Sequence, residues 1–400
     1  MLGKRQITHG IPAIAAIALL LGLTVLGLPS TLAQQNTPTP TVPVQTQVWL
    51  DLTATAGAPP PAANAFTATY EAEFANAVRT VTAASQSTPV TAPPEPTGSP
   101  TPMPAGSESA LRASASELVP VTGGVFLMGT TLEEASQAVD ECALYGSTCD
   151  IAWTADSMPA HPVTVDSFQI EVLEVSAQQF VQFLNEMGPN SHLTGCEGQR
   201  CAATAAEVES SFITFDGQEY GLTNEDILAD KPITSVTWYG AQAYCQAIGR
   251  RLPTEAEWER AARGPENYIY PWGFTFDPAR ANSSQSGTDG TTNVYEYQVS
   301  AGPYGAVNQA GNVQEWVADW YRSDYYAQQA DNPTANPQGP PTGTEKVLRG
   351  GSWDTGPLFL RTVHRRSAQP FETSPAVGFR CAADALPQPA GTPTSAPANG

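Results

Sequence analysis

The sequence predicts an α+β fold, because it combines capped helices with short strand-like runs in one folded body. The strongest helix signals lie in residues 231–264, where two helices meet at a corner fixed by Pro253. Two strand-like runs precede this stretch, at residues 120–128 and 162–171. A Gly-Gly pair breaks the first of them. From residue 264 to 372, Gly, Pro, Asn and Ser recur too often for long regular elements, so we expect ordered loops there.

The predicted helices carry end signals in the sequence. One helix begins after the capping residue Ser176 and ends at Gly188. The first helix of the central pair has apolar residues at helical spacing and ends at Gly249. The second begins with a capping box formed by Thr254 and Glu257, in which each side chain satisfies the other residue's amide.

Composition divides the chain into four parts. Residues 1–33 have a basic start, an apolar run and a small-residue cleavage site, which is typical of a signal peptide, or of an N-terminal membrane anchor if it is retained. Residues 34–117 are rich in Pro, Thr and Ala and predict a flexible linker. Residues 118–385 form the folded domain, and 386–400 a disordered tail. The domain is therefore expected outside the cytoplasm, secreted or anchored at the cell envelope.

The charge balance argues against some partners. The chain has 39 acidic and 18 basic residues, a net charge of −21. Phosphate backbones repel such a surface, so we expect no nucleic-acid binding. A soluble acidic surface is the simplest interpretation.

The cysteines are six in number, and an even count in an exported chain favours disulfides. A zinc site would need His or Cys residues at suitable distances along the chain. His161 and His192 lie nearest to the first four cysteines, but their spacing fits no common zinc site.

Several motifs occur in a fixed order along the folded part. They are RLPTEAEWERAARG at 251–264, YPWG at 270–273, GNVQEWVADW at 311–320, RGGSW at 349–353 and GFRCA at 378–382. Together they resemble the formylglycine-generating enzyme family, also called sulfatase-modifying factors, over residues 118–385. The resemblance implies an α+β fold related to C-type lectins. It also implies a disulfide between Cys245 and Cys381, which leaves Cys142–Cys149 and Cys196–Cys201 as local pairs.

The resemblance also locates a copper site that this sequence lacks. Family members that make formylglycine bind Cu(I) through two cysteines and oxidise a cysteine of a sulfatase. Those positions fall at Thr355 and near Leu360. A hydroxyl and a hydrocarbon are not the soft thiolate ligands that Cu(I) prefers, so copper is not expected.

A related branch of the superfamily uses non-haem iron. Nothing before residue 118 supplies its set of two histidines and one carboxylate. Of the remaining histidines, His364 lies beside Arg365 and Arg366, whose charges would weaken cation binding.

Calcium is the cofactor that the resemblance implies. The first predicted site has hard oxygen ligands, as calcium prefers, from Asn308, Gly311, Val313 and Glu315. The second, looser match consists of Asn282, Ser283, Asp289 and Thr291. Calcium would brace the loops; alternatively, Asn308 and Glu315 only brace the turn before Trp316.

The resemblance also places a substrate groove. Its predicted lining is Arg349, Trp353, Arg361, His364 and Arg365. Arg and Trp are favoured in peptide and glycan binding. In the alternative interpretation, Arg361 and Arg365 hold loop carbonyls and Trp353 is buried.

The predicted function is a non-oxidase binding or regulatory module that presents a groove to a peptide, protein, glycan or envelope partner. The main alternative is an enzyme, either a formylglycine-generating oxidase or a non-haem metal oxidase of the same superfamily. A third possibility is a structural envelope protein on a Pro/Thr stalk.

Overall fold

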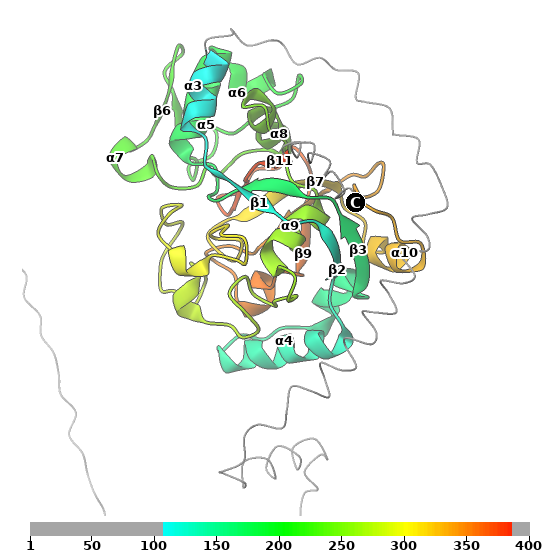
Figure 1. The fold of residues 1–400 in the computed structure, drawn as a ribbon. Coiled ribbons are helices and arrows are strands. Elements are labelled where there is room, and N and C mark those ends of the chain that lie inside the picture. Colours follow the sequence, from blue (N-terminus) through cyan, green and yellow to red (C-terminus); the bar gives the residue numbers. More distant parts are fainter. Residues whose placement is uncertain (1–106, 386–400) are drawn as a thin grey trace, which may run out of the picture. The chain divides into compact units, whose positions relative to one another are not determined.

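The computed structural model describes residues 107–385 of the chain (Figure 1). The predicted export segment at 1–33, the first 73 residues of the predicted linker (34–106) and the predicted tail at 386–400 lie outside this part. Among the described residues, no helix has both the length and the apolar character needed to cross a membrane.

The central helix corner forms as predicted. Helix α8 spans Trp238–Ala247 and helix α9 spans Glu255–Arg263. Thr254 Oγ1 accepts a hydrogen bond from the Glu257 amide (3.2 Å), and the Glu257 carboxylate accepts one from the Thr254 amide (2.8 Å), which confirms the capping box. Gly249 has a φ of 71°, a left-handed conformation that glycine adopts without steric cost.

A four-stranded sheet packs against α9. Its strands, in order across the sheet, are β10 (Val377–Gly378), β7 (Gln314–Trp320), β8 (Lys346–Arg349) and β9 (Arg365–Ala368). β10 and β7 are parallel, and the other neighbours are antiparallel. Trp258 of α9 is fully buried against valines of β7 and β8, so the helix and the sheet share one core.

A three-stranded sheet joins the two ends of the described chain. Its order is β1 (Leu118–Val121), β4 (Phe168–Glu171), β11 (Ala382–Asp384), with both pairings antiparallel. A second, two-stranded sheet pairs β2 (Gly124–Met128) with β3 (His161–Val165). The chain closes into one domain because its first and last strands both pair with β4.

Both strand-like runs are split into two strands: the first near its Gly-Gly pair, as predicted, and the second at a break that the sequence analysis did not predict. Residues 120–128 contain the break between β1 and β2, and residues 162–171 contain the break between β3 and β4. At Gly123, a Cβ atom would lie 2.5 Å from backbone atoms of Asp166 and Ser167. The two breaks therefore lie in contact, and only glycine fits there.

The folded body begins before the predicted boundary at residue 118. Helix α3 (Ser107–Ser114) packs on α5 (Ala177–Met187), and Leu111 is fully buried in the same core cluster as α5 residues. Gln179 Nε2 donates to the Ser114 carbonyl at 2.6 Å. The last residues of the predicted linker thus belong to the domain. α5 itself begins after the predicted capping residue Ser176, which forms a capping box with Gln179.

Shorter elements and long loops complete the α+β domain. The remaining elements are α4 (Leu132–Leu144), η1 (Ile151–Ser157), α6 (Ser191–Thr194), β5 (Ile213–Phe215), β6 (Tyr220–Leu222), α7 (Glu225–Leu228), η2 (Pro278–Arg280), η3 (Gln298–Ser300), α10 (Tyr325–Asp331) and η4 (Pro357–Leu360), where η denotes a 3-10 helix.

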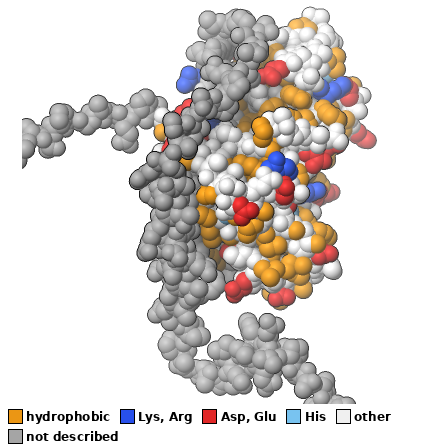
Figure 2. Space-filling view, turned by 90° about the vertical axis from the view of Figure 1, so that its right-hand side faces the viewer, with side chains coloured by type: hydrophobic (Ala, Val, Ile, Leu, Met, Phe, Trp, Pro, Cys, Tyr) orange, Lys and Arg blue, Asp and Glu red, His pale blue; other side chains and the backbone are white. Residues whose placement is uncertain are grey.

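The surface of the domain carries many acidic side chains. Figure 2 shows Asp and Glu side chains spread over the face that it views, with few Lys and Arg between them. Charged side chains of both signs also lie in the interior. The buried acidic ones are Glu171, Glu174, Glu255, Glu259, Glu315 and Asp319. Five arginines are among the largest fully buried side chains: Arg263, Arg349, Arg361, Arg365 and Arg380.

Candidate functional site

The segment between β8 and β9 contains both positions where copper-binding cysteines would lie. Thr355 Oγ1 accepts a hydrogen bond from the Ser352 amide (2.8 Å) and donates one to the Ser352 carbonyl (3.0 Å). Leu360, at the end of η4, is fully buried. Its cluster consists of Tyr270, Phe276, Ala281 and Ala310. Both side chains are therefore committed to the local structure.

The cysteines form the three predicted disulfides. Cys245 of α8 is bonded to Cys381 before β11, and the local pairs are Cys142–Cys149 and Cys196–Cys201. These bonds use all six cysteines of the sequence. Cu(I) is held by soft thiolates, and the residues at 355 and 360 supply none, so they do not fit a copper ion.

Two residues predicted to line the groove, Arg349 and Arg365, lie in the interior instead. Arg349 Nη2 is 2.6 Å from Glu259 Oε2, and its Nη1 is 3.0 Å from Glu255 Oε1. Arg365 Nε is 2.7 Å from Glu255 Oε1. All four side chains are at most 1% exposed. This corrects the groove prediction for the two arginines, because α9 supplies their carboxylate partners within the core.

The four buried charges stabilise one another. Burial alone would raise the pKa of Glu255, but Arg365 and Arg349 lower it below its ordinary value. Burial would likewise lower the pKa of each arginine, yet the acidic groups around them raise it. Loss of one partner leaves a buried charge uncompensated. We therefore assign this cluster a structural role.

The other three predicted groove residues lie near η4. Arg361 and His364 are buried, whereas Trp353 is half-buried and donates from Nε1 to the Pro375 carbonyl (3.5 Å). The His364 ring packs edge-on against Phe359, with 4.9 Å between centroids. Burial, together with three nearby arginines, lowers the pKa of His364 to about 3. The ring is therefore neutral near pH 7.

The first predicted calcium site lies where the loop enters β7. Arg380 donates to both carboxylate oxygens of Glu315 at 2.7 to 2.9 Å, and Trp258 Nε1 donates to one of them at 2.7 Å. The Asn308 amide donates to Glu174 (3.0 Å). A guanidinium thus already neutralises the carboxylate that calcium would need. As arranged, these residues do not fit a calcium ion, and calcium here rests on the sequence resemblance alone.

The second predicted calcium site is less compact. Asn282, Ser283 and Thr291 are buried, but Asp289 is exposed. Lys231 Nζ donates to the Thr291 carbonyl at 2.6 Å. An ammonium group at this oxygen opposes binding of a second cation there, so this set does not fit calcium as arranged either.

An open groove lies beside η4, between α4 and η1. Its volume is about 600 Å³, and its lining includes Val139, Asp140, Asp150, Ile151 and Trp153. The side chain of Trp153 is 47% exposed, and its ring lies 5.7 Å from that of Phe359 in η4. Sequence reasoning missed this tryptophan, since it belongs to none of the family motifs.

Comparison with known proteins supports the family assignment. Residues 105–385 match the family described as "Sulfatase-modifying factor enzyme 1-like domain". The chain is 38% identical over 228 residues to "Serine/threonine-protein kinase pkn1" of Chlamydia pneumoniae, covering 57% of this chain and 34% of the kinase. It therefore spans about a third of that relative's length.

Other matches cover a larger share of the related protein's own length. The formylglycine-generating enzyme of Streptomyces coelicolor is 32% identical over 330 residues, covering 74% of this chain and 96% of the enzyme. The solved structure of PvdO from Pseudomonas aeruginosa is 24% identical, with a TM-score of 0.48, and covers 68% of this chain and 95% of PvdO. Because the family match covers well over half of the sequence and contains every motif described above, the chain belongs to the sulfatase-modifying factor enzyme 1-like family, which includes the formylglycine-generating enzymes.

Proposed function

We propose that this chain is a binding module that keeps the scaffold of its family without the copper-dependent oxidation. The observation that supports this proposal is the pair of side chains at 355 and 360. Thr355 closes a tight loop by hydrogen bonds to Ser352, and Leu360 fills a hydrophobic cluster. Neither side chain is a Cu(I) ligand, and every cysteine is in a disulfide.

The rival proposal is an oxidase, either formylglycine-generating or using another metal. Relatives named formylglycine-generating enzyme favour it. It would require ligands other than the two missing thiolates. Among residues 107–385, no three His, Cys, Asp or Glu side chains are grouped so that they could hold a metal ion. We therefore place the binding module first.

The proposed ligand is a peptide or glycan segment with an apolar face, bound in the groove between α4 and η1. An exposed tryptophan in a concave site offers a large, rigid surface for stacking. Asp140 and Asp150 line the same groove and supply hydrogen-bond acceptors for hydroxyl or amide groups. Trp153 is therefore the residue on which we expect binding to depend most.

The proposed location is outside the cytoplasm, secreted or tethered at the cell envelope. The three disulfides favour an oxidising compartment. The export pattern of residues 1–33 favours the same location, and retention of that segment would provide the tether.

The test is ligand binding by the full chain, purified from an oxidising compartment. Peptide and glycan arrays identify ligands, and calorimetry then measures their affinity for the parent and for Trp153→Ala. We expect Trp153→Ala to weaken binding by about tenfold or more. The matched control is Phe371→Ala, since Phe371 is also exposed (58%) and does not line the groove. Equal affinity of the parent and Trp153→Ala would contradict the proposed groove.

A further inference from the structure

In the β5–β6 hairpin, the outer edge of β6 faces away from β5. The Ile213 carbonyl accepts from the Ala205 amide (2.7 Å), and the Ile213 amide donates to Ser211 Oγ (3.2 Å), so neither group bonds to Leu222 opposite. Since hydrogen-bonded pairs alternate along an antiparallel ladder, the backbone groups of Leu222 also point away from β5. Those of Tyr220, two residues earlier, point the same way.

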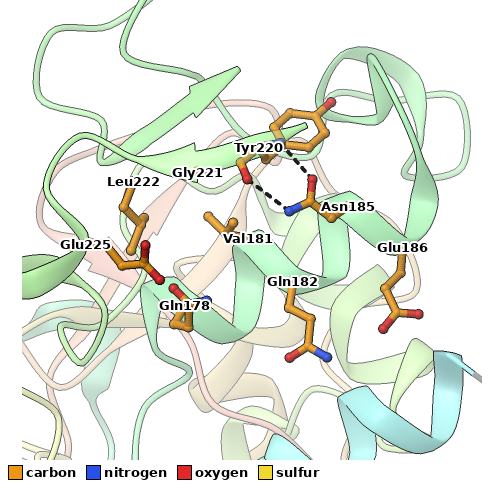
Figure 3. Close-up of a pocket in the computed structure, with 9 residues that line it drawn as sticks. All are labelled: Gln178, Val181, Gln182, Asn185, Glu186, Tyr220, Gly221, Leu222 and Glu225. Carbon is orange, nitrogen blue, oxygen red and sulfur yellow. Dashed lines mark hydrogen bonds between the residues drawn. The ribbon is translucent and has the colours of Figure 1, made fainter. Parts of the chain in front are cut away.

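A side chain already pairs with this outer edge as a neighbouring strand would. Asn185 of α5 accepts from the Tyr220 amide at 2.7 Å and donates to the Tyr220 carbonyl at 2.9 Å (Figure 3). One amide side chain thus supplies both a donor and an acceptor to one residue of β6. It also shows that the edge takes partners with peptide-like hydrogen-bonding groups.

The edge continues past Asn185 into a pocket of about 450 Å³. Leu222 lies at the pocket, and Val181 of α5 forms its apolar floor (Figure 3). Gln178 and Gln182 line the same space with further amide groups. An extended peptide placed here would meet the Leu222 backbone on one side and α5 amides on the other.

The charges around this pocket favour a basic occupant. Glu186 and Glu225 both line it, and none of its nine lining residues is Lys or Arg. Glu186 Oε2 is shielded from solvent and has no hydrogen-bond partner among the described residues. A basic side chain reaching this oxygen would satisfy it.

We propose that the outer edge of β6 and the adjoining pocket bind an extended peptide segment that carries Lys or Arg side chains, by strand addition. Main-chain hydrogen bonds to Leu222 give affinity, and the two glutamates select the basic residue. This site is separate from the groove at Trp153: α4 lies at one end of the domain in Figure 1, and α5 and β6 at the other. Peptide binding at β6 can therefore be confirmed or refuted independently of the proposed function.

The experiment is calorimetric titration of the full chain with the synthetic peptide acetyl-(Val-Lys)3-amide. We expect binding, weakened roughly two- to fivefold by Glu186→Gln and by Glu225→Gln. Glu209→Gln is the matched control, because Glu209 is exposed and does not line the pocket. Trp153→Ala is expected to bind like the parent.

Because the chain has a net charge of −21, a basic peptide could bind through charge alone, and this must be controlled. The same peptide N-methylated at alternate residues keeps its charge but loses the main-chain donors along one edge. We expect its binding to be lost, and that of acetyl-(Val-Glu)3-amide to be absent. Equal binding of the parent and N-methylated peptides, or no binding of the parent peptide at 1 mM, a concentration suited to weak sites, overturns the proposal.

Discussion

Arg349 on β8 and Glu259 on α9 form an ion pair inside the protein, with 2.6 Å between Nη2 and Oε2 and no exposure of either side chain. Arg349 also donates to Glu255 and to the Thr362 carbonyl. These contacts connect α9 to the four-stranded sheet and to the segment between β8 and β9.

Replacement of Arg349 by Met should destabilise the fold strongly. It removes the nearer cation of Glu259, which keeps only Arg263 at 3.4 Å. Loss of one partner of a buried pair costs about 3–5 kcal/mol. Urea unfolding measures the change. The matched control is Arg322→Met, since Arg322 pairs with Asp324 at the surface and its side chain is 41% exposed. We expect that change to cost less than about 1 kcal/mol. Similar losses in both variants would refute a structural role for the buried cluster.

His364 should make the protein sensitive to acid. Burial lowers the pKa of His364 from its ordinary 6.5 to about 3 in the folded state. Between these two values the unfolded chain binds a proton that the folded protein does not. The contribution of His364 to the free energy of unfolding is therefore fully present above pH 6.5. Below that pH the free energy of unfolding falls by about 1.4 kcal/mol per pH unit.

The measurement is urea unfolding of the parent and of His364→Leu at pH 7 and pH 5. The parent should lose about 2 kcal/mol more than the variant over this interval, while the other titrating groups cancel in the comparison. Parallel pH profiles would show that His364 titrates normally in the folded state.

The long-range disulfide should contribute more stability than a local one. Cys245 and Cys381 are 136 positions apart, whereas Cys142 and Cys149 are 7 apart. The chain-entropy relation gives about 5 kcal/mol for the long loop and about 2.5 kcal/mol for the short one. Replacing each pair by two alanines and measuring unfolding in urea compares them. A larger loss for the local pair would contradict this ordering.

Calcium should have little effect on stability, because Arg380 already neutralises Glu315. An ion bound at one hundred times its dissociation constant would add about 2.7 kcal/mol and raise the thermal midpoint by roughly 5 °C or more. We expect the midpoint in millimolar calcium to match that in EDTA. A rise of that size would show that the predicted ligands rearrange around an ion.

Local structure could be predicted from the sequence where both hydrogen-bonding residues lie within one short segment. The capping boxes at Ser176 and Thr254 formed because donor and acceptor lie three residues apart. A similar box at Thr131 and Glu134 starts α4, and its T-x-x-E spacing was a signal that sequence reasoning did not use. The groove at Trp153 was missed together with that helix.

The position of the arginines could not be predicted in the same way. Arg349 and Arg365 are neighbours of the family's site in sequence, which placed them in the groove. Their partner Glu255 lies 94 and 110 positions away and meets them only when α9 packs on the sheet. Burial of a charge depends on such tertiary contacts, which no local pattern reports.

The most direct test of the central claim is the oxidation assay itself. The full chain is incubated with Cu(I), oxygen and a sulfatase-type peptide containing one cysteine, with the Streptomyces coelicolor formylglycine-generating enzyme as positive control. Copper retained after gel filtration is measured alongside the peptide mass. We predict an unchanged peptide and no stoichiometric copper. Conversion of the peptide cysteine to formylglycine, with copper retained by the protein, would contradict the account.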